Sequence, residues 1–155
     1  MEYIMASKKN IDECVRMRML YILNDDPTLS DSDKLSFEKT LYDYFNRKLN
    51  KEIYAFLAKE DKRIVGMALL LMIEKPANPS MKNGITAEVL SVIGDEEDRH
   101  KGIATNLINN LINVAKEKDV CRIVLRATAM GKPLYLKLGF KEHPFKCEEM
   151  AYIIK

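Results

Sequence analysis

Two apolar, β-branched runs at the centre of the chain are separated only by a short polar turn. Ile53–Lys59 and Arg63–Glu74 flank Glu60-Asp61-Lys62, an arrangement typical of an antiparallel β-hairpin. A third run of this kind, Thr86–Gly94, follows a polar loop at Pro76–Gly84. Because apolar strands must bury their faces against other elements, these runs predict a sheet that is covered by helices.

Helical periodicity is present before the hairpin. Glu2–Ala6 is short and apolar enough for an opening strand, and Ser7 or Asn10 is placed to cap a helix after it. The turn-forming stretch Asn24–Ser32 separates this helix from a second one. The second helix is indicated by apolar residues at helical spacing, namely Phe37, Leu41, Tyr44, Phe45 and Leu49.

The second half of the chain alternates helices with strands. A helix beginning at Gly102 joins Thr86–Gly94 to the next apolar run, Arg122–Ala127, so this pair of strands should be parallel with a right-handed crossover. A short helix, Pro133–Leu138, should end at Gly139. Strand-like segments from Phe140 onward and at Glu149–Ile154 should close the chain. The pattern predicts an α/β fold: a mixed, mostly antiparallel sheet with helices on both faces and a central parallel β-α-β unit.

Composition narrows the class of protein. The 155 residues predict a single domain, 1–155, and a net charge of +2 argues against nucleic acid as a partner. The longest apolar run, Gly66–Ile73, is too short to span a membrane, so we expect a cytoplasmic protein with no membrane partner. Cys14, Cys121 and Cys147 follow no metal-ligand or disulfide pattern, and we expect reduced thiols and no metal.

The segment Arg99-His100-Lys101-Gly102-Ile103-Ala104 lies where a strand leads into a helix. A helix start offers unpaired N–H groups and a positive dipole end, and glycine allows close approach of an anion, so this position favours a phosphate. The segment is neither a Walker loop nor a dinucleotide fingerprint. By itself the string is weak evidence, because such short motifs recur by chance, and a solvated turn that enters an ordinary helix explains it as well.

A second segment, after the next predicted strand, makes the Arg99–Ala104 segment more specific. VIGDEEDRHKGIATNL from Val92, followed by LRATAMGKPLYLKLGF from Leu125, resembles the acetyl-CoA-binding core of the Gcn5-related N-acetyltransferase (GNAT) superfamily. The resemblance implies that backbone near Val92 and Gly94 lines the pantetheine arm and that Tyr135 protonates the departing CoA thiolate. It implies a cofactor site made of Val92, Gly94, Arg99, His100, Lys101, Gly102, Ile103, Ala104, Thr105 and Thr128. Thr128 stands where many relatives carry asparagine, and the acidic run 95–98 also departs from the family pattern.

Glu88 is a candidate general base. An alkylamine with a pKa of ~10.4 must lose a proton before it attacks a thioester, and a carboxylate among apolar residues should have a raised pKa. Strand alternation predicts that Glu88 shares a face with Thr86, Leu90 and Val92. If that face is solvated, Glu88 is only a surface acid, and the sequence leaves both readings open.

The expected activity is an acetyl-CoA-dependent N-acetyltransferase that transfers an acetyl group to a primary amine by direct attack on the thioester. The alternative is a non-catalytic acyl-CoA-binding or sensory module on the same fold. The acceptor, a small molecule or a peptide amine, stays open, as does a homodimeric state. Acidic residues in the first interhelical stretch either attract a cationic amine or serve as turn and cap residues, namely Asp25, Asp26, Asp31 and Asp33.

Overall fold

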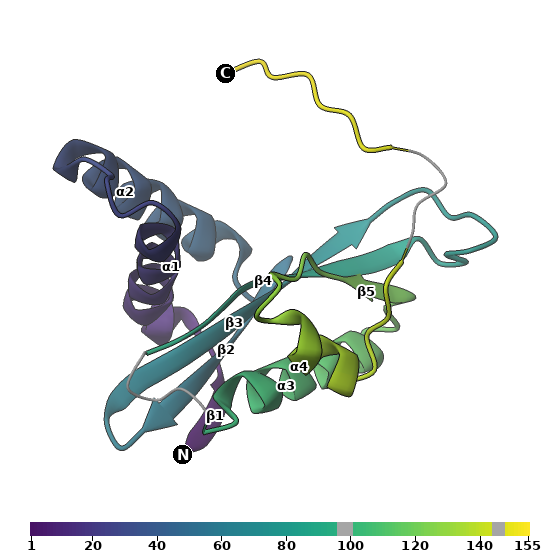
Figure 1. Ribbon diagram of the computed structural model, residues 1–155, viewed down its shortest axis with the longest axis horizontal. Helices are drawn as coiled ribbons and strands as arrows, with labels where there is room; N and C mark the ends of the chain where they lie inside the picture. The colour runs from purple at the N-terminus through teal and green to yellow at the C-terminus, as the bar shows by residue number, and fades with distance from the viewer. Residues whose placement is uncertain (96–100, 144–147) are drawn as a thin grey trace.

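The computed structural model of the chain describes residues 1–95, 101–143 and 148–155. A five-stranded sheet with the order β1-β2-β3-β4-β5 runs through its centre (Figure 1). The strands are β1 (Glu2–Met5), β2 (Ile53–Glu60), β3 (Arg63–Glu74), β4 (Ile85–Gly94) and β5 (Arg122–Val124). The helices are the 3-10 turn η1 (Lys8–Asn10), α1 (Ile11–Asp25), α2 (Asp31–Lys48), α3 (Ile103–Glu117) and α4 (Lys132–Lys137). Strands β1 to β4 pair antiparallel and β4 pairs parallel with β5, which confirms the predicted mixed α/β class.

Helices cover both faces of the sheet, and each face has its own core (Figure 1). On one face, Met17 of α1 and Phe45 of α2 lie in one core with Leu57 of β2, and all three side chains are buried. On the other face, α3 contributes Leu107 and Leu111, both fully buried. Alternate residues of the strands therefore enter two different cores, which explains the nearly continuous apolar runs of β2 and β3.

Local capping explains where the first two helices begin. The Ser7 hydroxyl accepts a hydrogen bond from the Lys9 N–H, and the Ser7 N–H donates to Asn10 Oδ1 at 2.9 Å, so both proposed cap residues act together before α1. At the start of α2, the Asp33 N–H donates to the Ser30 hydroxyl at 3.2 Å. The polar residues at these positions are used by the backbone.

The acidic residues between α1 and α2 serve mainly the backbone and their near neighbours. Asp26 Oδ1 accepts hydrogen bonds from the N–H and hydroxyl of Thr28, which hold the pKa of this exposed carboxyl below its usual range. The Asp33 carboxylate accepts a hydrogen bond from the Ser30 hydroxyl, and Oδ1 of Asp31 lies 3.6 Å from Nζ of Lys34. These contacts correspond to the turn and cap role that the sequence left open.

A β-bulge interrupts β4 and changes which residues share its face. The register against β3 shifts between Met67 and Leu69, and Ser91 adopts a left-handed φ of 50°. As a result Leu90 packs with the α1 side of the sheet while Val92 packs with the α3 side. The expectation that Val92 shares a face with Glu88 was therefore wrong, because the bulge resets the alternation.

The C-terminal part of the chain departs most from the expectation. Strand β5 ends at Val124 instead of Ala127, and residues 141–143 and 148–155 form no strand. The tail runs away from the sheet (Figure 1), with Tyr152, Ile153 and Ile154 at least 78% exposed. Strand propensity alone does not produce a strand when no partner supplies the ladder, which is why the predicted closing strands were wrong for the described residues.

The edge of β5 that faces away from β4 carries no partner strand within the described residues. A groove of about 970 Å³ follows this edge between the last turns of α3 and α4, with Val120, Leu125 and Phe140 in its lining. It lies toward the C-terminal end of α3, far along the helix from Gly102. None of the described helices is long and apolar enough to cross a membrane.

Candidate active site

Strand β4 pairs with β5 over only part of its length. The half of β4 that β5 leaves unpaired, together with β5 and α4, is called the opening below. Their ladder consists of Thr86↔Arg122, Ala87↔Ile123 and Glu88↔Val124 and then stops. Strand β4 continues to Gly94, so the residues from Val89 onward have no partner on this side within the described residues. The predicted residues Val92 and Gly94 both lie on this unpaired half, where backbone groups are available to a ligand.

The start of α3 lies beyond the end of β4. Gly102 is the N-cap residue with a φ of 74°, a left-handed conformation that glycine adopts without strain, and as a glycine it has no side chain that could cap the helix. The first helical hydrogen bond runs from the Asn106 N–H to the Gly102 carbonyl at 3.1 Å. Within the described residues, the N–H groups of Ile103, Ala104 and Thr105 have no acceptor, which makes this end of the helix suited to an anion.

Gly66 on β3 fixes the position of this helix start. A Cβ at Gly66 would lie 2.8 Å from Cγ2 of Ile103 and 3.2 Å from the Ile93 carbonyl oxygen. Ile103 is 6% exposed and packs in the core on the α3 side, where Val92 and Tyr135 also pack. The first turn of α3 can approach the sheet this closely because position 66 has no side chain.

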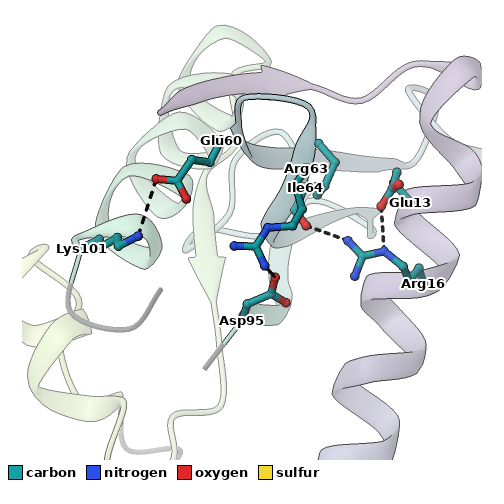
Figure 2. Close-up of polar contacts among 7 residues, drawn as sticks. All are labelled: Glu13, Arg16, Glu60, Arg63, Ile64, Asp95 and Lys101. Carbon is teal, nitrogen blue, oxygen red and sulfur yellow. Dashed lines mark hydrogen bonds and ion pairs between the residues drawn. The ribbon is translucent and has the colours of Figure 1, made fainter. Parts of the chain in front are cut away.

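Two ion pairs connect the ends of the strand-to-helix segment to the β2–β3 hairpin (Figure 2). Oδ2 of Asp95 lies 3.4 Å from Nη1 of Arg63, and Nζ of Lys101 lies 3.6 Å from Oε1 of Glu60. Lys101 was predicted to add positive charge for a phosphate, and here its ammonium group faces a carboxylate of the hairpin. Arg99 and His100, also predicted site residues, lie outside the described residues.

Tyr135 of α4 is half-buried beside the open part of the sheet. Its ring contacts Phe140 edge-to-face at 5.8 Å, and a Cβ at Gly131 would lie 3.3 Å from the Tyr135 ring. Burial raises the pKa of Tyr135, and the nearby phenol of Tyr21 adds to this rise. Tyr135 therefore remains a neutral hydroxyl, able to donate a proton, well above physiological pH.

Glu88 is half-buried on the face of the sheet that α1 and α2 cover. It lies opposite Leu71, and both Leu71 and Leu90 pack with the core of that face. None of the hydrogen bonds or ion pairs among the described residues engages its carboxylate. Glu88 is thus neither a fully solvated surface acid nor part of a structural network, and its role as a base stays a prediction.

Thr128 has a structural role in the observed conformation. Its hydroxyl accepts a hydrogen bond from the Gly131 N–H at 3.1 Å, and its carbonyl accepts from Gly131 and Lys132. These bonds shape the turn that leads into α4 and so place Tyr135. Whether the exposed Thr128 also contacts a ligand stays a prediction.

Three residues at the opening were not predicted from the sequence. Arg18 donates a hydrogen bond to the hydroxyl of Ser91 in the β4 bulge, and its guanidinium lies 5.1 Å from the ring centroid of Tyr21. The i,i+3 spacing of Arg18 and Tyr21 on a helix is a signal that could have paired them. Ser91 carries no such signal, since its importance depends on the bulge.

The described residues contain no cluster of three or more His, Cys, Asp or Glu side chains that could hold a metal ion. The only histidine with a described position, His143, lies with Nε2 at 3.1 Å from Nη1 of Arg122, near the groove along β5. Cys14 is buried in the core on the α1 side, and Cys121 is exposed. Among the described residues, the polar groups at the opening include the hydroxyls of Ser91 and Tyr21, the Glu88 carboxylate, the Arg18 guanidinium and backbone N–H groups.

Comparison with known proteins gives this arrangement a family. Residues 16–140 match the Acetyltransferase (GNAT) family. A predicted acetyltransferase from Clostridium acetobutylicum, solved with acetyl-CoA, is 29% identical over 97% of this chain and 95% of that chain, with a TM-score of 0.82. A GCN5-related N-acetyltransferase from Ralstonia eutropha is 20% identical over 96% of this chain and 97% of that one, with a TM-score of 0.76.

A more distant solved structure shares the fold. An aminoglycoside acetyltransferase from an uncultured soil metagenomic sample, in complex with sisomicin, is 16% identical over 99% of this chain and 96% of that chain, with a TM-score of 0.69. No curated protein matches the chain. The family match covers both the open β4–β5 pair and the start of α3, and the chain belongs to the GNAT family of acetyltransferases.

Proposed function

We propose that this acetyltransferase transfers the acetyl group of acetyl-CoA to a primary amine by direct attack of the amine on the thioester. The observation that carries the proposal is the start of α3, where Gly102 and three N–H groups with no acceptor among the described residues lie beyond the half of β4 that those residues leave unpaired. This combination provides an anion site next to a strand whose backbone is free to pair with an extended ligand.

The residues present fit acetyl-CoA. The N–H groups of Ile103, Ala104 and Thr105 would hold the pyrophosphate. Among the described residues, a Cβ at Gly102 would have only Nδ2 of Asn106 within 4 Å, at 3.9 Å, so these residues leave room for an anion at the helix start. Backbone of Val92 and Gly94 would accompany the pantetheine arm. Acetyl-CoA, when bound, supplies an acetyl group activated as a thioester.

Two side chains handle the protons of the reaction. The amine nitrogen forms the new amide bond while the bond from carbon to sulfur breaks and its electron pair leaves with the thiolate. Glu88, directly or through water, takes the proton that the ammonium must lose. Tyr135 donates a proton to the leaving thiolate, which its raised pKa permits because the phenol is neutral at the working pH.

Binding is tested by adding a negative charge at the helix start. Gly102→Asp should weaken acetyl-CoA binding by at least about tenfold, because the carboxylate repels the pyrophosphate. Gly102→Asn is the matched control, since Asn has the same shape without the charge and both residues tolerate a left-handed φ. Calorimetric titration of the folded variants with acetyl-CoA measures the difference. Equal affinities in the Asp and Asn variants would reject this site.

Chemistry is tested with two nearly isosteric substitutions, once an amine acceptor has been identified by thiol release. Tyr135→Phe should lower kcat by ~10²-fold and leave acetyl-CoA affinity nearly unchanged.

Glu88→Gln should lower the rate at neutral pH, and this rate should recover as the pH rises, because free amine becomes abundant. Normal turnover in both variants would leave positioning as the source of catalysis, and acetyl-CoA binding without any turnover would favour the non-catalytic alternative.

A further inference from the structure

Arg18 is a half-buried cation at the opening between β4 and β5. It extends from α1, donates a hydrogen bond to the Ser91 hydroxyl and stacks over the Tyr21 ring at 5.1 Å. A hydroxyl and an aromatic face satisfy only part of a guanidinium, which has five N–H donors in a planar fork. Several donors of Arg18 are therefore available to another acceptor.

The charge of Arg18 has no carboxylate partner among the described residues. Its neighbour on the same helix, Arg16, shows the contrast: Arg16 lies 2.8 Å from the Glu13 carboxylate and donates to the Ile64 carbonyl at 2.7 Å (Figure 2). Removing a cation from water without a counter-charge is unfavourable. An anion that arrives at Arg18 would therefore gain a charge-assisted interaction without first breaking an ion pair.

Arg18 lies beside the residues that the proposed reaction uses. Ser91 belongs to the bulge of the unpaired half of β4, and Tyr21, over which Arg18 stacks, is the phenol that couples electrostatically to Tyr135. Glu88 lies on the face of β4 that α1 covers, and it precedes Ser91 by three residues. At ~3.3 Å per residue this spacing corresponds to roughly 10 Å of strand, which two long side chains can span toward one small molecule.

We propose that Arg18 binds a carboxylate of the acceptor, so that the substrates of this acetyltransferase are amino acids or other amines that also carry a carboxylate. The guanidinium fork matches a carboxylate in planar, bidentate geometry. In this arrangement the amine end of the acceptor faces Glu88 and the carboxylate end faces Arg18. The proposal rests on the proposed function and adds the chemical class of the acceptor to it.

The test compares acceptors with and without the carboxylate, at equal concentrations of free amine, because amidation also lowers the pKa of the α-amino group. The probes are the free L-amino acids and their carboxamides, with thiol release measured at saturating acetyl-CoA. Wild-type protein should prefer the free acids by about 10- to 100-fold in kcat/KM, as expected for one charged hydrogen-bonded pair. Arg18→Gln should reduce this preference to near one by raising KM for the acids, with little change for the carboxamides.

Two further variants separate recognition from structure. Arg18→Lys keeps the charge but loses the fork, and should retain part of the preference. Arg16→Gln removes a guanidinium from the same helix, and should change acids and carboxamides equally. Melting temperatures of all variants establish that each one is folded.

Several results would overturn the proposal. These are equal use of acids and carboxamides by the wild-type protein, an equal loss for both in Arg18→Gln, and no turnover of any probe by protein that binds acetyl-CoA. A wild-type protein that does not bind acetyl-CoA in a parallel titration would instead reject the proposed function itself, and this proposal with it.

Discussion

Strand β2 pairs with β3 along its whole length, whereas β4 and β5 share a ladder of only three residue pairs. Residues 53–58 of β2 are all buried, because this hairpin has a core on both of its faces. By contrast, β5 and α4 contain no buried residue. We call β2 and β3, with the helices that cover them, the hairpin region, and this region forms the core. The opening, which is the unpaired half of β4 with β5 and α4, forms an edge of the sheet.

This difference separates stability from chemistry. A ligand that pairs with backbone needs strand edges without partners, and such edges contribute little to the free energy of folding. The residues proposed for catalysis and recognition accordingly lie at the opening or at its rim, while the largest buried side chains lie elsewhere. Loss of function at the opening should therefore be separable from loss of folding.

The largest expected effect comes from truncating the same residue type in the two regions. Leu57→Ala in β2 removes a fully buried side chain and should lower the free energy of unfolding by about 2 to 5 kcal/mol. Leu136→Ala in α4, where the side chain is 49% exposed, should change it by less than about 0.5 kcal/mol. Urea unfolding of the two variants measures both values, and comparable losses would contradict the division into core and edge.

A smaller effect is expected where the two regions meet. Gly66→Ala places a Cβ 2.8 Å from Ile103, so the start of α3 must shift, and stability should fall by about 1 to 3 kcal/mol. Acetyl-CoA binding should weaken at the same time, because the helix start moves with Ile103. Gly94→Ala is the control for stability, since its Cβ would have an ordinary 3.6 Å contact with Val65. An unchanged melting temperature and affinity in Gly66→Ala would show that the close packing does not position α3.

The smallest effect concerns pH and compares a buried thiol with an exposed one. Burial, with a contribution from the charge of Glu13, raises the pKa of the Cys14 thiol to about 12. Because the pKa is higher in the folded protein, the unfolded chain loses the thiol proton at lower pH than the folded protein does. The free energy of unfolding is therefore unaffected by the titration of Cys14 below the pKa of the unfolded thiol, and it decreases as the pH rises from that pKa toward 12. Between pH 9 and 10 the loss should be roughly 1 kcal/mol.

Unfolding measured at several pH values tests the thiol prediction through a difference between variants. Cys14→Ala should remove this part of the pH dependence, whereas Cys121→Ala, at an exposed position, should keep it. The difference between the variants cancels the titration of the tyrosines. Identical slopes for Cys14→Ala and wild-type protein would contradict the deep burial of the Cys14 thiol.

Much of the fold follows from local patterns in the sequence. The hairpin, the amphipathic helices and the helix between two parallel strands were predicted because each depends on periodicity and turn residues within a short window. The start of α3 at Gly102 was also predictable, since a glycine between a strand and an apolar helix has few alternatives. Tyr135 was named through the resemblance of its segment to the GNAT superfamily.

Other features depend on contacts between distant segments. The bulge at Ser91 arises from the pairing of β4 with β3, and it reversed the predicted side of Val92. The closing strands predicted after Phe140 were wrong for the described residues, since their apolar residues meet no ladder partner. Arg18 was missed because its significance lies in having no carboxylate partner among the described residues, a property of its neighbours in space.

The sequence by itself determined the order of the elements as far as α4, the helix start at the proposed phosphate site and the family, because each of these depends on residues that are adjacent or regularly spaced along the chain. Only the tertiary structure decided that β4 and β5 part after Glu88, that Gly66 admits Ile103, and that Arg18 and Tyr21 lie beside the opening. These features join residues that are tens of positions apart, and burial, register and charge pairing at such distances exist only once the chain has folded.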